Sequence, residues 1–218
     1  MPRGKSGCNK KMRYDYVNDR PLPAYPCFPL PAPLKDVRNC GRRRESVSKG
    51  KRRLLRQGCV KFNLIDKIES ISDDRLVAVK FVTLAEEYLA DHFPTFPVLP
   101  GVLMLEAIVQ SAGWLLHRRR EFACSMAVLK EARNVKYGTF VAPGDALRVE
   151  IELAKLTDTG GTFKAIGQVN QQQAVSARVE VAYFNLADRQ PELASTDIAL
   201  TQYNRNRWAV LQQPPAAL

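Results

Sequence analysis

Apolar and polar residues alternate strictly along two stretches in the second half of the chain, residues 146–156 and 174–184. A strand with this alternation has one buried and one solvent-exposed face, which is typical of an antiparallel sheet. Residues 162–171, after a turn at Gly160-Gly161, and residues 127–137 predict two further strands. The second half of the chain therefore predicts an antiparallel sheet.

Two more strands are predicted earlier in the chain, over residues 60–71 and 75–83, and a turn at Ser72–Asp74 joins them. Residues 83–93 predict a turn or two of helix that ends at the prolines which follow. These elements bring the expected number of antiparallel strands to five or six.

The longest apolar block, residues 101–117, predicts the central helix of the domain. Its apolar residues cover nearly every side of a helical wheel, which indicates a buried helix. Pro100 suits the first turn, and His117 with Arg118–Arg120 would place positive charge at the end that the helix dipole favours. The expected fold class is α+β, with an antiparallel sheet wrapped around a long central apolar helix.

Charge and composition divide the chain into three parts. The net charge is +11, but residues 1–59 hold 16 Lys/Arg against 4 Asp/Glu, whereas residues 60–218 hold 17 against 18. The first part is also rich in proline, and predicts a basic, disordered arm. We expect a folded domain over 60–185 and a tail over 186–218 with one short helix around Asp197–Val210. Because Val60 would read as Met at a GTG start codon, the arm is also a candidate gene-model artefact.

Several classes of protein are disfavoured by simple patterns. Four of the five cysteines lie in residues 1–59, but none forms a C-x-x-C pair, so no metal site is expected. There is no hydrophobic run after the basic start and no clean apolar stretch of about 18 residues, so we expect neither a signal peptide nor a membrane span. The protein is predicted to be cytoplasmic.

Two residues near the start of the central helix suggest acid–base chemistry. Glu106 is a carboxylate inside the apolar block, and His92 precedes it by fourteen positions. A carboxyl group in apolar surroundings can stay protonated and act as a general acid, and an imidazole can act as a general base. The backbone N–H groups at Gly101 can bind a developing oxyanion. Base, acid and oxyanion site are what an elimination beside a thioester carbonyl requires.

The stretch HFPTFPVLPGVLMLEAIVQSAG resembles the signature of the FabZ-type (3R)-hydroxyacyl-acyl carrier protein dehydratases, H-F-P-G-x-P-V-x-P-G-V-L-x-x-E-A-x-x-Q. VKYGTFVAPGDALRVEIEL and NLIDKI resemble two further strand motifs of that family, so the resemblance covers residues 60–185. It implies a hot-dog fold, assembly into homodimers or higher oligomers, and formation of trans-2-enoyl-acyl carrier protein in fatty-acid biosynthesis. It implies no metal or redox cofactor.

The resemblance also implies roles for four residues. His92 would act on the C2 proton and Glu106 on the C3 hydroxyl, with the two residues supplied by opposite subunits. The N–H of Gly101 would hold the thioester oxygen, and Gln110 would orient groups of the site. The acyl chain would lie in an apolar tunnel beside the helix, while acyl carrier protein docks outside.

Details of the motif refine this expectation. The related FabA-type dehydratase-isomerases have aspartate where this chain has Glu106, which favours dehydration without isomerisation. Asp91 and Thr95 replace glycines that flank the family's histidine, and the family's P-H-R-Y-P-F-L lead-in is absent before NLIDKI. These departures affect the loop that carries His92 and the substrate entrance.

Two other functions remain open at the level of sequence. One is a hot-dog acyl thioesterase, which would use the helix carboxylate to activate water. The other is a non-catalytic hot-dog protein whose basic arm binds nucleic acid, although the arm lacks the aromatic interleaving that favours this partner. Because acyl carrier protein is acidic, a basic docking surface is expected near the tunnel. Its candidate residues are Arg118, Arg119, Arg120, Lys130, Arg133 and Lys136.

Overall fold

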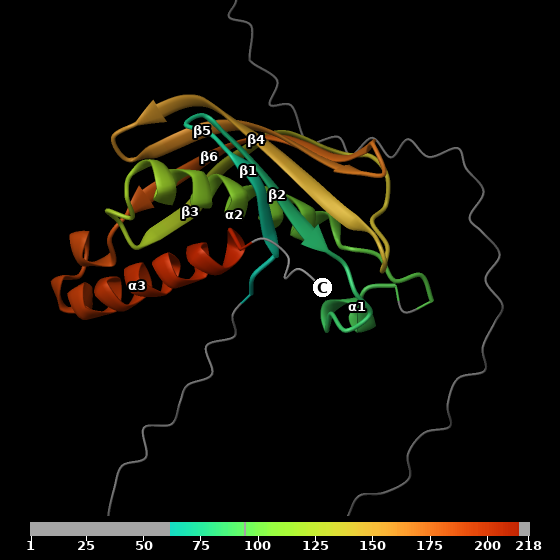
Figure 1. The fold of residues 1–218 in the computed structure, drawn as a ribbon, viewed down its shortest axis with the longest axis horizontal. Helices are drawn as coiled ribbons and strands as arrows, with labels where there is room; N and C mark the ends of the chain where they lie inside the picture. Colours follow the sequence, from blue (N-terminus) through green and yellow to red (C-terminus); the bar gives the residue numbers. More distant parts are fainter. Residues whose placement is uncertain (1–61, 94, 214–218) are drawn as a thin grey trace, which may run out of the picture. The chain divides into compact units, whose positions relative to one another are not determined.

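The computed structural model describes residues 62–93 and 95–213 (Figure 1). The predictions for residues 1–59 lie outside this range. The described elements are β1 (Lys67–Ile71), β2 (Arg75–Phe81), α1 (Tyr88–Asp91), α2 (Gly101–Arg119), β3 (Met126–Tyr137), β4 (Ala146–Thr157), β5 (Gly160–Val169), β6 (Gln172–Phe184), the short 3-10 helices η1 (Leu186–Asp188) and η2 (Pro191–Leu193), and α3 (Ala194–Leu211). None of the helices in this part of the chain is long and apolar enough to cross a bilayer.

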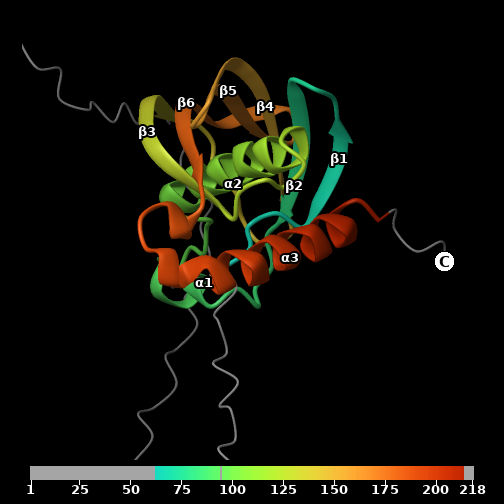
Figure 2. The ribbon, with the colours of Figure 1, turned by 90° about the vertical axis from the view of Figure 1, so that its left-hand side faces the viewer.

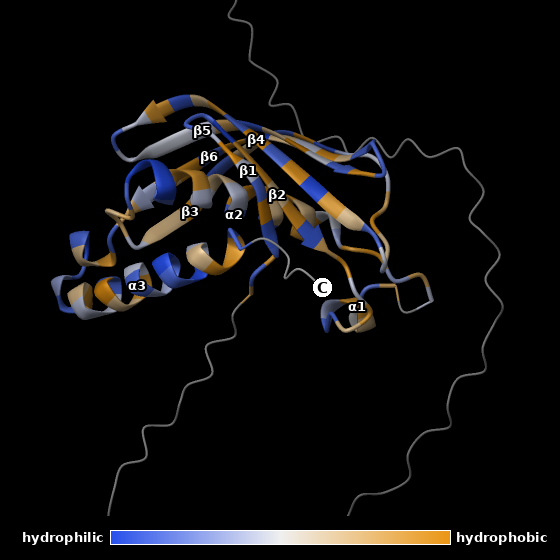
Figure 3. Ribbon diagram, viewed as in Figure 1, coloured by the Kyte–Doolittle hydropathy of each residue, from blue (hydrophilic) through white to orange (hydrophobic). Residues whose placement is uncertain are grey.

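The six strands of the described region form one antiparallel sheet in the order β1-β2-β4-β5-β6-β3. The sheet curves around α2, as two views of the ribbon show (Figures 1 and 2). The predicted alternation of apolar and polar residues appears along β4 (Figure 3). Leu147, Val149 and Ile151 are fully buried, and Arg148 is exposed. The predicted α+β fold, a sheet wrapped around a central helix, is confirmed.

The turn before β5 differs from the sequence prediction. It consists of Asp158-Thr159, because Thr157 already pairs with Gly160, and both glycines therefore lie in the strand. Gly160 has a φ of +156°, and a Cβ there would lie 2.0 Å from the carbonyl oxygen of Val181. The glycine is therefore required by the close approach of the neighbouring strand β6 rather than by the turn.

Helix α2 is buried more completely in its second half than in its first. Of the residues from Ala107 to His117, all but Gln110 are buried. In the first turn Val102 is 69% exposed, and Leu103 is half-buried. The expectation of a helix buried on nearly every side is thus correct for the second half of α2 in this single chain, whereas the first half presents apolar side chains to solvent.

The C-terminal helix α3 packs along α2 on the side away from the sheet (Figures 1 and 2). The ring of Trp208, which is buried, lies 6.0 Å from that of Trp114 on α2. Near the other end of α3, the buried carboxylate of Asp197 accepts backbone hydrogen bonds from Leu186 at 3.0 Å and Ala187 at 2.8 Å. These contacts fix both ends of a helix that is longer than the short one expected.

His117 corrects one prediction, because it does not place a positive charge at the end of α2. The side chain is buried, with Nδ1 3.2 Å from the hydroxyl of Tyr183, and its ring stacks on Phe122. Asn204 of α3 lies 3.5 Å from Nε2. Burial lowers the pKa of His117 from 6.5 to about 4, so the ring is neutral near neutral pH.

This buried histidine predicts loss of stability in acid. Because the pKa of His117 is lower in the folded chain than the ordinary value of 6.5, the unfolded chain takes up the proton first as pH falls. The stabilisation is therefore complete above about pH 6.5 and is lost progressively down to about pH 4, at a total of about 3 kcal/mol. Urea unfolding of His117→Gln and the parent protein across this window measures the difference. Parallel curves for the two proteins would show that another group causes the acid sensitivity.

Candidate active site

His92 follows the single turn of α1 and starts a tightly folded loop. Its backbone is extended, at φ −110° and ψ 100°, and the next residue, Phe93, has a φ of +52°. The carbonyl of Phe93 accepts a hydrogen bond from the N–H of Phe96 at 2.8 Å, which closes the turn. A left-handed residue other than glycine costs about 1–2 kcal/mol. The loop thus holds a strained residue beside the candidate base, in a chain that lacks the flanking glycines of the FabZ pattern.

The N-terminus of α2 is fixed from two sides. The N–H of Leu99 donates to the carbonyl of Val141 at 2.8 Å, just before the N-cap residue Pro100. A Cβ on Gly101 would lie 3.0 Å from the ring of Tyr137, so the ring packs directly on this glycine. The first N–H groups of a helix have no partner within the helix and carry partial positive charge. The geometry therefore provides an anchored helix N-terminus that is able to bind an oxyanion.

Glu106 lies in the second turn of α2 and is held by a directional chain of hydrogen bonds. The N–H of Leu64 donates to Oε1 of Gln110 at 2.9 Å, and Nε2 of Gln110 donates to Oε1 of Glu106 at 3.0 Å. A backbone N–H can only donate, so it fixes which end of the amide faces Leu64. The amide N–H must then point at Glu106. This arrangement holds one carboxyl oxygen of Glu106, Oε1, in place.

The role of Gln110 predicts a measurable loss of turnover. Gln110→Met keeps the length of the side chain but removes both hydrogen bonds, and a hydrogen bond to a charged group is worth about 1.5–3 kcal/mol. We expect kcat to fall about tenfold to hundredfold in a dehydratase assay. Gln202→Met, on the exposed side of α3, is the matched control and should keep the parent kcat. Parent-like turnover in Gln110→Met would mean that this chain of hydrogen bonds does not orient the acid.

Gly101, Glu106 and Gln110 all lie in the first ten residues of α2, whereas the candidate docking residues do not lie together. Arg118, Arg119 and Arg120 lie 12–14 residues beyond Glu106, which is about 18–21 Å along the helix. Lys136, on β3, precedes Tyr137 and so lies near the N-terminus of α2. Lys130 and Arg133 also lie on β3, between the two ends of α2. The six residues therefore do not surround one end of the helix.

Several of the candidate docking residues form ion pairs within the chain. Arg119 pairs with Asp74 at 2.9 Å, Lys130 with Glu180 at 2.7 Å and Arg133 with Glu131 at 2.6 Å. Arg120 hydrogen-bonds the carbonyl oxygen of Thr157. Pairing does not exclude contact with a partner, but it reduces the charge that these positions present.

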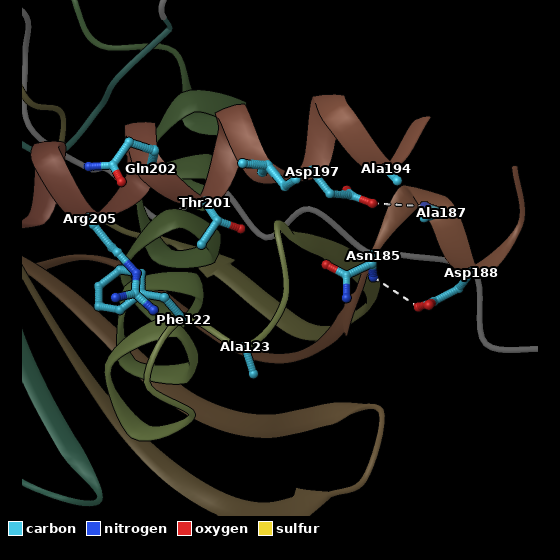
Figure 4. Close-up of a pocket in the computed structure, with 11 residues that line it drawn as sticks. Phe122, Ala123, Asn185, Ala187, Asp188, Ala194, Asp197, Thr201, Gln202 and Arg205 are labelled. Carbon is cyan, nitrogen blue, oxygen red and sulfur yellow. Dashed lines mark hydrogen bonds between the residues drawn. The ribbon is translucent and has the colours of Figure 1, made fainter. Parts of the chain in front are cut away.

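Two grooves among the described residues lie away from the candidate catalytic residues. A groove of about 500 Å³ lies between α3 and the loops before it, and Figure 4 shows the carboxylate of Asp197 directed at Ala187 on its wall. A second groove, of about 390 Å³, lies at the C-terminal end of α2 beside Arg118. Neither groove is lined by His92 or Glu106. No three His, Cys, Asp or Glu side chains of the described residues cluster closely enough to hold a metal ion.

Comparison with known proteins identifies the family. The profile of the FabA-like domain matches residues 59–178. The chain is 37% identical over 121 residues to the 3-hydroxyacyl-[acyl-carrier-protein] dehydratase FabZ of Clostridium perfringens, covering 56% of this chain and 87% of that protein. It is 39% identical over 122 residues to the FabZ of Pelotomaculum thermopropionicum, with the same two coverages.

Among solved structures, the dehydratase heterocomplex ApeI:P from Xenorhabdus doucetiae has a TM-score of 0.52 at 18% identity, covering 61% of this chain and 90% of the matched chain. This likeness supports the fold. An antiparallel sheet around a helix that carries an acid in its second turn thus defines the class, the hot-dog proteins. The chain belongs to the FabA-like family, and within it to the FabZ-type 3-hydroxyacyl-acyl carrier protein dehydratases.

Proposed function

We propose that this protein is a cytoplasmic dehydratase of fatty-acid biosynthesis, which removes water from (3R)-hydroxyacyl-acyl carrier protein to give the trans-2-enoyl product. One observation carries the assignment of the site: in a FabZ-type chain, Glu106 is oriented by Gln110 and Leu64 one turn from an anchored helix N-terminus. The acid follows His92 at the interval that the FabZ signature requires. No observation of the described residues favours the thioesterase or nucleic-acid alternatives.

The proposed reaction is a 1,2-elimination. His92 takes the proton from C2 while the thioester oxygen, which gains negative charge, accepts a hydrogen bond from the N–H of Gly101. The C2 electrons form the double bond, and the C3–O bond breaks as Glu106 donates a proton to the departing hydroxyl, which leaves as water. The N–H of Gln110 stabilises the Glu106 carboxylate that results. Transfer of the C2 proton from His92 to Glu106 then restores both groups.

We propose that a second copy of the chain completes the site. The first turn of α2 exposes an apolar side chain, Val102, and leaves Leu103 half-buried, whereas nearly all residues from Ala107 to His117 are buried. Burial of such residues against another copy would lower their free energy by about 25 cal/mol per Å² of apolar surface. The resemblance to FabZ implies the same arrangement, in which His92 and Glu106 of one site come from different subunits.

Acyl carrier protein is the proposed partner, and Lys136 is the candidate docking residue nearest to the site. We expect Lys136→Glu to raise the KM for a carrier-linked substrate about threefold to tenfold through loss of charge complementarity. The KM for a small thioester should stay the same. Arg118→Glu, which reverses an exposed charge at the far end of α2, is the matched control. Equal effects of the two reversals, or an equal effect on both substrates, would contradict docking at Lys136.

A direct assay tests the proposed reaction. Purified protein is mixed with 3-hydroxybutyryl and crotonyl thioesters, first as small thioesters and then as a ladder of carrier-linked chains. A dehydratase produces a reversible change in enoyl absorbance with no release of thiol. Irreversible release of free thiol without a change in the enoyl signal would instead identify a thioesterase.

A further inference from the structure

Lys80 is a charged residue in the interior of the sheet. It belongs to β2, its side chain is 5% exposed, and its Nζ lies 2.5 Å from Oε1 of Glu86 and 3.4 Å from Oδ2 of Asp66. Burial of an ammonium group is costly unless it is paired and hydrogen-bonded. The two carboxylates come from different segments, one before β1 and one before α1. Lys80 therefore links three parts of the chain through charge.

The link to α1 matters because this helix has little stability of its own. It consists of four residues, Tyr88–Asp91, and its N-cap residue, Glu87, makes no side-chain capping bond. A single turn does not persist without tertiary contacts. Its tertiary contacts include Leu89, which is 4% exposed and belongs to the core, Tyr88, which packs against the core, and the ion pair of Glu86, whose carbonyl also accepts the N–H of Leu89 at 3.1 Å.

The other carboxylate of the cluster, Asp66, joins Lys80 to the segment before β1. Oδ2 of Asp66 accepts the N–H of Phe81 at 2.8 Å, so it is bound to β2 through both the backbone and the ammonium group. Asp66 lies two residues after Leu64, whose N–H orients Gln110. The segment that contains Leu64 and Asp66 thus contacts Gln110, which bonds Glu106, and also Lys80, which pairs with Glu86.

Tyr88 lies beside this cluster without taking part in it. Its hydroxyl is buried and has no hydrogen-bond partner among the described residues. Burial, and then the negative charges of Glu86 and Asp66, raise the pKa of Tyr88. The residue is one turn before His92 and packs against the core. Tyr88 is therefore a suitable control position, because it lies beside the ion pair but forms no hydrogen bond with Lys80, Glu86 or Asp66.

We propose that the partly buried ion pair of Lys80 with Glu86, braced by Asp66, is a positioning device that sets the place of His92 in the active site. It acts through α1, since His92 is the residue at which that turn ends. The inference rests on the proposed function, in which His92 is the base. It assigns to Lys80 and Glu86 an effect on the proton-transfer step rather than on substrate binding.

Kinetics of three variants test the proposal. Lys80→Met and Glu86→Gln should each lower kcat about tenfold to hundredfold, the scale of a small misplacement of a catalytic group, and leave KM within about twofold. The double variant should be no worse than the poorer single one, because removal of both partners leaves no unpaired buried charge. Tyr88→Phe, which removes only the unpartnered hydroxyl, should keep the parent kcat. A loss in Tyr88→Phe equal to that in Glu86→Gln would overturn the role of the ion pair.

Nuclear magnetic resonance of the histidines gives a readout that does not depend on activity. The chain contains two histidines, and His117 is buried against α3, far along α2 from the site. In Lys80→Met and Glu86→Gln the ring signals of His92 should shift or broaden, while those of His117 stay in place and exclude a general loss of structure. Unchanged His92 signals together with unchanged kcat would refute the proposal. If the parent protein has no dehydratase activity, the proposed function fails, yet the His92 signals still decide whether the ion pair positions the loop.

Discussion

Glu106→Gln is expected to lower kcat by about 10²–10⁴-fold, the usual effect of removing a positioned general acid. The amide has the size of the carboxyl group and keeps an oxygen that can accept the N–H of Gln110, so the hydrogen-bond chain from Leu64 can remain. It cannot release a proton to the departing C3 hydroxyl. The loss should therefore fall on kcat, with little change in KM or in the urea midpoint of unfolding.

Glu106→Asp is the matched control for this substitution. It keeps a titratable carboxyl group but withdraws it by one methylene from both Gln110 and the substrate. We expect turnover between those of the parent and Glu106→Gln. Turnover of the aspartate variant as low as that of the amide would indicate that position matters more than the proton. Parent-like turnover of Glu106→Gln would remove the general acid from the mechanism.

The periodic parts of the fold follow from the sequence because each strand and the central helix must bury one side. The alternation in β4 and the apolar block of α2 report directly on burial, and they predicted these elements closely. The sequence predicted α3 only as a shorter helix around Asp197–Val210, because α3 is held at a few separate positions, such as Asp197 and Trp208, rather than along a continuous apolar face. A helix held by specific polar bonds has no strong periodic signal in its sequence.

Long-range polar contacts explain what else could not be predicted. Leu64 and Gln110 are 46 residues apart, and a backbone N–H has no sequence signature. Lys80 and Glu86 look like ordinary charges of an exposed strand and loop until the fold places the ammonium group inside. His117 likewise reads as a cation at a helix end, since nothing in the sequence shows that α3 will cover it. The sequence thus supplied the candidate acid and base together with Gln110, whereas the contacts of Leu64 and of Lys80 with Glu86 depend on the folded chain.

His92→Ala is expected to cause a loss of the same order, about 10²–10⁴-fold in kcat, because C2 then lacks a base. The substitution does not touch the core, since His92 is only partly buried in a loop, so the unfolding midpoint should change little. A parent-like rate in His92→Ala would assign proton removal to another group.

A mixed dimer of His92→Ala and Glu106→Gln chains then decides how the site is built. If the two groups of a site come from different copies, one site of the mixed dimer receives both intact residues and the other receives neither. Turnover per dimer should then rise to as much as half that of the parent, although each homodimer is nearly inactive. If both groups of a site belong to one chain, every site of the mixed dimer lacks one of them and no recovery occurs.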